Sequence, residues 1–155
     1  MKVILAIFTL ALGQIGSQEL TWQAPIANTF IVNQYRAPAS EYSSGHRGID
    51  LAGAIDDLVF APESGEVKFV GKVGYRNVLT LETAVGEITF EPVCSSLQVG
   101  SWVGRGEALG NICLPDAEYV WHCEDVCLHL GLKARNGYLS AEKFIFGMSP
   151  SRLLP

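Results

Sequence analysis

Two short stretches of the chain carry residue types that commonly bind metals. GHRGIDLA, residues 45–52, holds His46 and, four residues later, Asp50. If GIDLA is a strand entered from a turn, His46 at the turn and Asp50 on the strand can converge on one point. Such a His/Asp pair is also common as a solvated local hydrogen-bond partnership, and that alternative stays open. The second stretch, VCLHLGLK at residues 126–133, holds His129.

Together, His46, Asp50 and His129 would supply two imidazoles and one carboxylate. This ligand set suits Zn²⁺ with a fourth position left for water, the arrangement of catalytic rather than structural zinc sites. A zinc ion lowers the pKa of water toward neutrality and polarises a carbonyl. A hydrolase of this kind also needs a general base or a donor for the oxyanion. The hypothesis is therefore one Zn²⁺ held by these three residues.

The strand expected around His129 has a clear alternation. Side chains alternate between the two faces of a strand, so Cys127, His129 and Gly131 share one face. The other face carries Val126 and three leucines, which identifies it as the core face. His129 on the non-core face, beside a glycine that does not block approach, is well placed as a ligand. An exposed strand histidine without a ligand role is the competing interpretation.

The elements that must position these residues are predicted to be short β-strands. Sixteen glycines and turn signals about every ten residues are typical of small sandwiches and barrels. We therefore predict an all-β fold with a compact antiparallel core and little helix, with one helical turn at residues 141–146. The predicted strands are 30–35, 48–52, 58–62, 65–73, 77–83, 86–93, 101–103, 107–112 and 126–133.

Length and charge limit the organisation of the chain and its partners. The 155 residues are enough for one domain. One lysine followed by an apolar run, Val3 to Leu12, has the layout of a secretory signal and is too short to span a bilayer as a helix. We expect residues 1–17 to be a signal peptide, 18–42 a lead-in that wraps the core, and 43–155 the β domain. The net charge of −5, without a basic stripe, argues against nucleic acid as a partner.

Four segments give the chain a specific resemblance. GHRGIDLA, APESGEVKFVG, VGSWVGRGEALG and CLHLGLKARNGYL occur in that order between residues 43 and 139. In order and spacing they resemble the lysostaphin-type, or LytM-like, zinc metallopeptidases of peptidase family M23, which cleave peptidoglycan peptides. The resemblance implies a compact antiparallel β core. It also assigns the zinc ligands to His46, Asp50 and His129, from a His-x-x-x-Asp motif and a late His-x-His motif.

The sequence departs from the family at both non-ligand catalytic histidines. Cys127 stands at the first histidine of the late motif, and Glu91 stands where the other is expected. Glu91 is a candidate general base, and a solvent-facing carboxylate is the alternative. His122 is a candidate to replace a lost histidine in position, and a surface location is the alternative. Tyr42, Arg47 and Trp121 are candidates to line a substrate groove. The EPV and CLHLGL segments are similar to those of a secreted branch of the family.

Three accounts of Cys127 follow from the resemblance and from the expected export. In the first, Cys123 pairs with Cys127 and Cys94 with Cys113, because paired cysteines are usual in exported chains. In the second, Cys127 is a thiolate that joins the zinc and blocks hydrolysis. In the third, it is an inert packed thiol. The first account is favoured.

Two functions follow from these observations, together with one alternative that is disfavoured. The first is a secreted zinc metalloendopeptidase that acts on peptidoglycan peptides in the cell wall, without stable membrane insertion. The second is a degenerate module of the same fold that binds peptidoglycan or activates other cell-wall hydrolases. A biotinyl or lipoyl carrier domain shares the glycine and valine rhythm, but no lysine lies at a hairpin tip with the flanking residues that modification requires.

Overall fold

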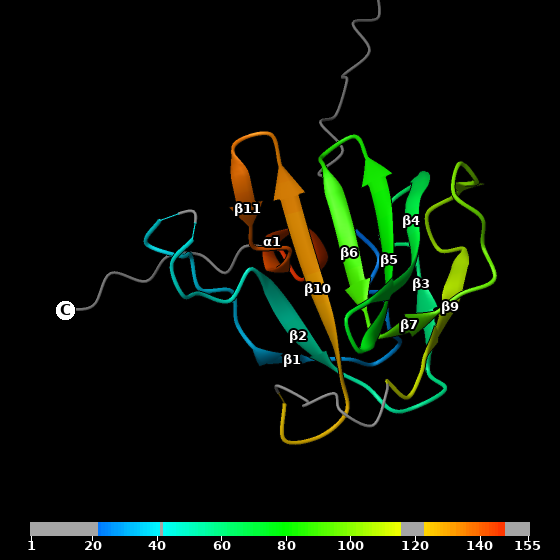
Figure 1. The fold of residues 1–155 in the computed structure, drawn as a ribbon, viewed down its shortest axis with the longest axis horizontal. Coiled ribbons are helices and arrows are strands. Elements are labelled where there is room, and N and C mark those ends of the chain that lie inside the picture. The colour runs from blue at the N-terminus through cyan, green and yellow to red at the C-terminus, as the bar shows by residue number, and fades with distance from the viewer. Residues whose placement is uncertain (1–21, 41, 116–122, 148–155) are drawn as a thin grey trace, which may run out of the picture.

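The computed structural model describes residues 22–40, 42–115 and 123–147, and their regular secondary structure consists almost entirely of two antiparallel sheets (Figure 1). The larger sheet contains β1 Ile31–Asn33, β2 Gly48–Ala52, β4 Gly65–Val73, β5 Arg76–Thr83, β6 Glu87–Glu91, β8 Trp102–Val103, β10 Cys127–Ala134 and β11 Gly137–Leu139. The smaller sheet contains β3 Leu58–Phe60, β7 Val93–Cys94 and β9 Ala108–Ile112. The predicted all-β class with little helix is confirmed.

Strand β10 is an interior strand of the larger sheet, where the order is β1-β2-β10-β6-β5-β4-β8. Its first half pairs with β2, and its second half pairs on the same side with β11. Strand β6 lies along its other edge, as Figure 1 shows. A residue in the middle of β10 therefore has neighbours directly opposite it on two strands.

Alternation along these strands separates an apolar face from a polar one. On β10, Leu128, Leu130 and Leu132 are fully buried, and each such leucine contributes about 1.5–3 kcal/mol of burial free energy. The residues opposite them on β2 and β6 are also apolar and buried: Ile49, Leu51, Ile88 and Phe90. The predicted core face is therefore correct. The residues between them point to the other face of the sheet.

The smaller sheet and the segments near both ends contribute to the core. Trp22 is 3% exposed, and its ring stacks on Phe144 with a centroid distance of 4.6 Å. Phe144 lies in the single-turn helix α1, Glu142–Ile145, where the helical turn was predicted.

Within the described residues, no helix is long and apolar enough to cross a membrane.

The predicted strands correspond to observed ones, with two corrections. The segment 86–93, expected as one strand, is divided into β6 and β7, which belong to different sheets. Pro92 lies at the division, and it has no N–H to continue a ladder. Strand β11 was not predicted; it pairs with β10 across a turn in which Gly137 has φ of 113°.

Candidate metal site

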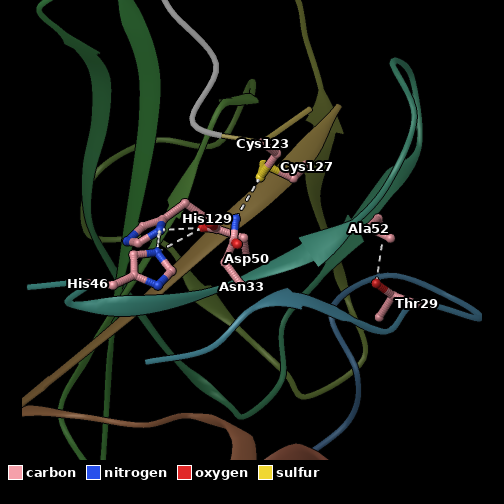
Figure 2. The surroundings of a disulfide bond; sticks show 8 residues. All are labelled: Thr29, Asn33, His46, Asp50, Ala52, Cys123, Cys127 and His129. Carbon is pink, nitrogen blue, oxygen red and sulfur yellow. Dashed lines mark hydrogen bonds and ion pairs between the residues drawn. A yellow bond between two sulfur atoms is a disulfide. The ribbon is translucent and has the colours of Figure 1, made fainter. Parts of the chain in front are cut away.

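Three candidate ligands converge on the polar face of the larger sheet (Figure 2). Asp50 on β2 and His129 on β10 are directly opposite each other, so their side chains emerge on the same face. His46 precedes β2 and is held by backbone hydrogen bonds with Arg36 in both directions. Asp50 Oδ1 lies 2.7 Å from His129 Nδ1 and 3.1 Å from His46 Nε2. The two imidazole nitrogens are 3.2 Å apart.

Neighbouring residues orient the ligand atoms. His46 Nδ1 lies 2.8 Å from the Gln34 carbonyl oxygen. A carbonyl can only accept a hydrogen bond, so Nδ1 carries the proton and Nε2 presents its lone pair to the cluster. Asn33 Nδ2 donates to Asp50 Oδ2 at 2.9 Å, which leaves Oδ1 facing the two histidines. Partners of this kind fix the tautomer and orientation of metal ligands.

The donor set fits a zinc ion. All three ligand atoms lie within 3.2 Å of one another. Ligands at about 2.0–2.2 Å from a tetrahedral zinc would be separated by about 3.3–3.6 Å, so small outward movements of the three atoms would admit the ion. A cavity of about 120 Å³ opens beside His46 and Asp50, with Asn33 and Arg36 also in its lining.

The burial of Asp50 supports a cationic partner at this position. Its side chain is 1% exposed, and it is the one charged residue classed as buried among those the structure describes. A buried carboxylate is costly unless it is hydrogen-bonded and paired with positive charge. A cation held between Asp50, His46 and His129 would provide that charge.

Two facing glycines shape the surroundings of His129. Gly48 and Gly131 are opposite each other in the β2–β10 register. A Cβ at Gly48 would lie 2.6 Å from His129 Nε2 and 2.5 Å from the Leu130 carbonyl oxygen, so the imidazole occupies the space that a side chain would need. A Cβ at Gly131 would meet nothing closer than 3.6 Å. Gly48 therefore admits the imidazole ring, and Gly131 leaves the sheet surface beside it open.

Cys127 is in a disulfide with Cys123, and Cys94 is in a disulfide with Cys113. Both pairings were predicted and are confirmed. Cys123, Cys127 and Asp50 place potential ligand atoms within 4.8 Å of one another, but a bridged sulfur is not a thiolate. The accounts of Cys127 as a zinc-bound thiolate or a free packed thiol are therefore wrong. Asn33 contacts both Asp50 of the candidate metal site and the Cys123–Cys127 disulfide, since its Nδ2 is also 3.6 Å from Cys123 Sγ (Figure 2).

Glu91 lies on the other side of His129. It is directly opposite His129 in the β10–β6 register, so it shares the polar face. Its Oε2 is 2.8 Å from Arg76 Nε, and its side chain is 12% exposed. The Arg76 Nε has no aligned hydrogen-bond acceptor despite this short ion-pair distance. Glu91 is thus a largely buried carboxylate held by an arginine, outside the group of three ligand atoms.

A polar groove of about 380 Å³ extends from His129 and Glu91 along the sheet surface. Arg47 contributes to it, as the sequence suggested. Tyr42 is 92% exposed and is not part of its lining. His122, a candidate catalytic residue, and Trp121, a candidate groove residue, both lie outside the described residues.

Sequence reasoning missed three residues that position the site: Asn33, Gly48 and Arg76. Gly48 lies within the motif that contains His46 and Asp50, so its place there was a usable signal. Asn33 and Arg76 offered no local signal, because each reaches the site only through strand pairing, β1 with β2 and β5 with β6.

Comparison with known proteins places the chain in a family. The family model described as Peptidase family M23 matches residues 44–139. An uncharacterized protein of Mycobacterium tuberculosis is 32% identical over 102 residues, which are 65% of this chain and 40% of that protein. An uncharacterized protein of Mycobacterium bovis matches to the same extent, so the chain spans less than half the length of these relatives.

Solved structures share the fold. Lysostaphin has a TM-score of 0.62 at 20% identity, covering 83% of this chain and 54% of that one. A zinc-containing peptidase from Vibrio cholerae also gives 0.62 at 20% identity, covering 77% of this chain and 38% of that one. Identities this low show likeness of fold alone. With the family model covering most of the described residues, the chain belongs to peptidase family M23.

Proposed function

We propose that this protein is an exported zinc metalloendopeptidase that acts on peptidoglycan peptides in the cell wall. The observation that carries the proposal is the convergence of His46 Nε2, Asp50 Oδ1 and His129 Nδ1 within 3.2 Å of one another, at one end of an open polar groove. Membership of a peptidase family supports the reaction class, and the resemblance of the sequence motifs to the peptidoglycan-cleaving lysostaphin-type enzymes supports the substrate.

The three ligands would hold one Zn²⁺, and each is already oriented by its surroundings. His46 is fixed through Gln34, Asp50 through Asn33, and His129 by the space that Gly48 leaves. The metal would supply a Lewis acid that polarises the scissile carbonyl and activates a water molecule. The open sheet surface at Gly131 would let a peptide chain approach His129 closely.

Glu91 is the proposed general base. Its side chain emerges opposite His129 on the same face, and Arg76 contacts Oε2, which leaves Oε1 to accept a proton. Glu91 would take the proton from the attacking water and deliver it to the leaving amine. Arg76 would keep the carboxylate in place through their ion pair.

Export is supported by the two disulfides, since such bonds persist in oxidising compartments. The amino-terminal apolar run gives the same expectation. The favoured location is therefore the cell wall or the space outside the cytoplasmic membrane.

A degenerate module of the same fold is the second candidate, and a specific observation favours it. The disulfide occupies Cys127 at a position where active relatives are expected to have a histidine. Such a module would keep the groove, bind peptidoglycan peptides and activate another cell-wall hydrolase.

A peptide-release assay on purified peptidoglycan separates the two candidates. Zinc-loaded wild-type protein is expected to release peptides, and the metal-free protein is expected to release none. Glu91→Gln keeps the size of the side chain but removes the base, and it should lower the rate by about 10²–10⁴-fold. Equal release by wild type and Glu91→Gln would remove Glu91 from the mechanism. Binding to peptidoglycan without release by the zinc-loaded protein would establish the second candidate instead.

A further inference from the structure

The two sides of the candidate metal site differ in charge. Strand β10 runs from one side to the other, with the Cys123–Cys127 loop at its start, His129 within it and Lys133 near its end. The loop carries Glu124 and Asp125, both exposed, in a groove of about 490 Å³. The groove on the other side contains the cationic residues Arg47, Arg76 and Lys133.

The carboxylates of the second groove do not cancel its positive charge. Glu91 is paired with Arg76, and Glu87 lies opposite Lys133 in the β10–β6 register. No carboxylate of the described residues forms an ion pair with the Lys133 ammonium, although Glu87 is its cross-strand neighbour. With three cations against two carboxylates, this groove has a net charge of +1 in a chain whose net charge is −5.

The floor of the groove is suited to a peptide with a polar group. Thr80 and Thr89, a cross-strand pair, line it with hydroxyl groups. The floor is open at Gly131, where an added Cβ would find only ordinary contacts. His129 and Lys133 are four residue steps apart along the strand, a distance of about 13 Å. An extended peptide centred on His129 would therefore reach Lys133 within about four residues.

We propose that the Lys133 side of the site binds a carboxylate of the substrate. The preferred substrate is then an acidic peptide, which lies across the three candidate metal ligands in a single orientation. The carboxylate meets Lys133 on this side, whereas Glu124 and Asp125 would repel it on the other. This inference rests on the proposed function for its substrate, but the binding it describes does not require hydrolysis.

Two isosteric probes test the inference: N-acetyl-Ala-Glu-Ala amide and N-acetyl-Ala-Gln-Ala amide, which differ by one carboxylate. Their Kd values are measured by NMR titration of the metal-free protein at about 50 mM salt, a concentration at which screening is modest. The carboxylate peptide is expected to bind about fivefold more tightly, with the amide signals of Thr89, Gly131 and Lys133 shifting.

Matched variants locate the effect. Lys133→Gln should bring the ratio of the two Kd values to about 1, because the remaining groove charges then sum to zero. Lys72→Gln, which removes an exposed lysine from β4 outside the groove, should keep the wild-type ratio. Equal Kd values in the wild type, or an unchanged ratio in Lys133→Gln, would overturn the inference. If the ratio behaves as expected while the zinc-loaded protein releases nothing from peptidoglycan, the proposed hydrolysis fails and the carboxylate site stands.

Discussion

Replacing Gly48 by alanine should disable the candidate zinc site through one methyl group. The new Cβ would lie 2.6 Å and 2.7 Å from His129 Nε2 and Cε1, whereas such atoms pack best at about 3.5–4.0 Å. The Leu130 carbonyl oxygen at 2.5 Å prevents the methyl group from moving away. The imidazole must therefore shift by about 1 Å, beyond the roughly 0.5 Å within which a functional geometry must be held.

The expected size of this effect follows from overpacking and from lost ligand geometry. Forcing a methyl group into a packed site costs about 1–3 kcal/mol of folding free energy. Zinc affinity should fall on the order of 100-fold, which is the upper end of the loss in metal affinity that follows when a ligand is no longer held in its orientation. Affinity is measured by competition with a chromophoric chelator, and folding free energy by urea unfolding of the metal-free protein.

Gly131→Ala is the matched control, since the two glycines face each other across the same strand pair. Its Cβ would meet nothing closer than 3.6 Å, and its φ lies outside the left-handed region. It should bind zinc as the wild type does and should gain about 0.4–1 kcal/mol of stability from a less flexible unfolded chain. The reasoning is refuted if Gly48→Ala keeps wild-type zinc affinity, or if both variants lose it equally.

Two further predictions concern the support of the site. Asn33→Ala removes the donor to the buried Asp50 oxygen, so it should destabilise the metal-free protein by about 1–3 kcal/mol and weaken zinc binding about 10–100-fold. Urea unfolding measures the loss of stability, and chelator competition measures the loss of zinc affinity. Unchanged values would contradict the role assigned to Asn33. Removing the Cys94–Cys113 disulfide by paired serine substitution should cost about 3 kcal/mol of folding free energy, against about 2 kcal/mol for Cys123–Cys127, because the loops span 19 and 4 residues. Thermal unfolding of the two variants checks this order. A reversed order would show that native contacts outweigh chain entropy.

Local patterns were enough to predict much of the fold and the ligand set. The alternation in residues 126–133 correctly assigned the leucines to the core and His129 to the opposite face. The spacing of His46 and Asp50 suggested convergence, and the structure brings them together with His129. These features depend on neighbours a few residues apart in the sequence, where side-chain direction is set by the strand itself.

The remaining features depend on which strands pair and in what register. Asn33 reaches Asp50 because β1 is the edge strand beside β2, and a register irregularity lies just before it. Arg76 reaches Glu91 because β5 and β6 are neighbours in the sheet. Strand β11 exists because β10 extends beyond β2 and leaves an edge to pair. None of these pairings has a signature in a short sequence window.

The zinc content of the purified protein tests the central claim most directly. After dialysis against a zinc-containing buffer and removal of excess metal, elemental analysis should find about one zinc per chain in the wild type. It should find none in His129→Ala, which removes one of the three convergent ligands. A wild-type protein that remains metal-free under these conditions would contradict the account.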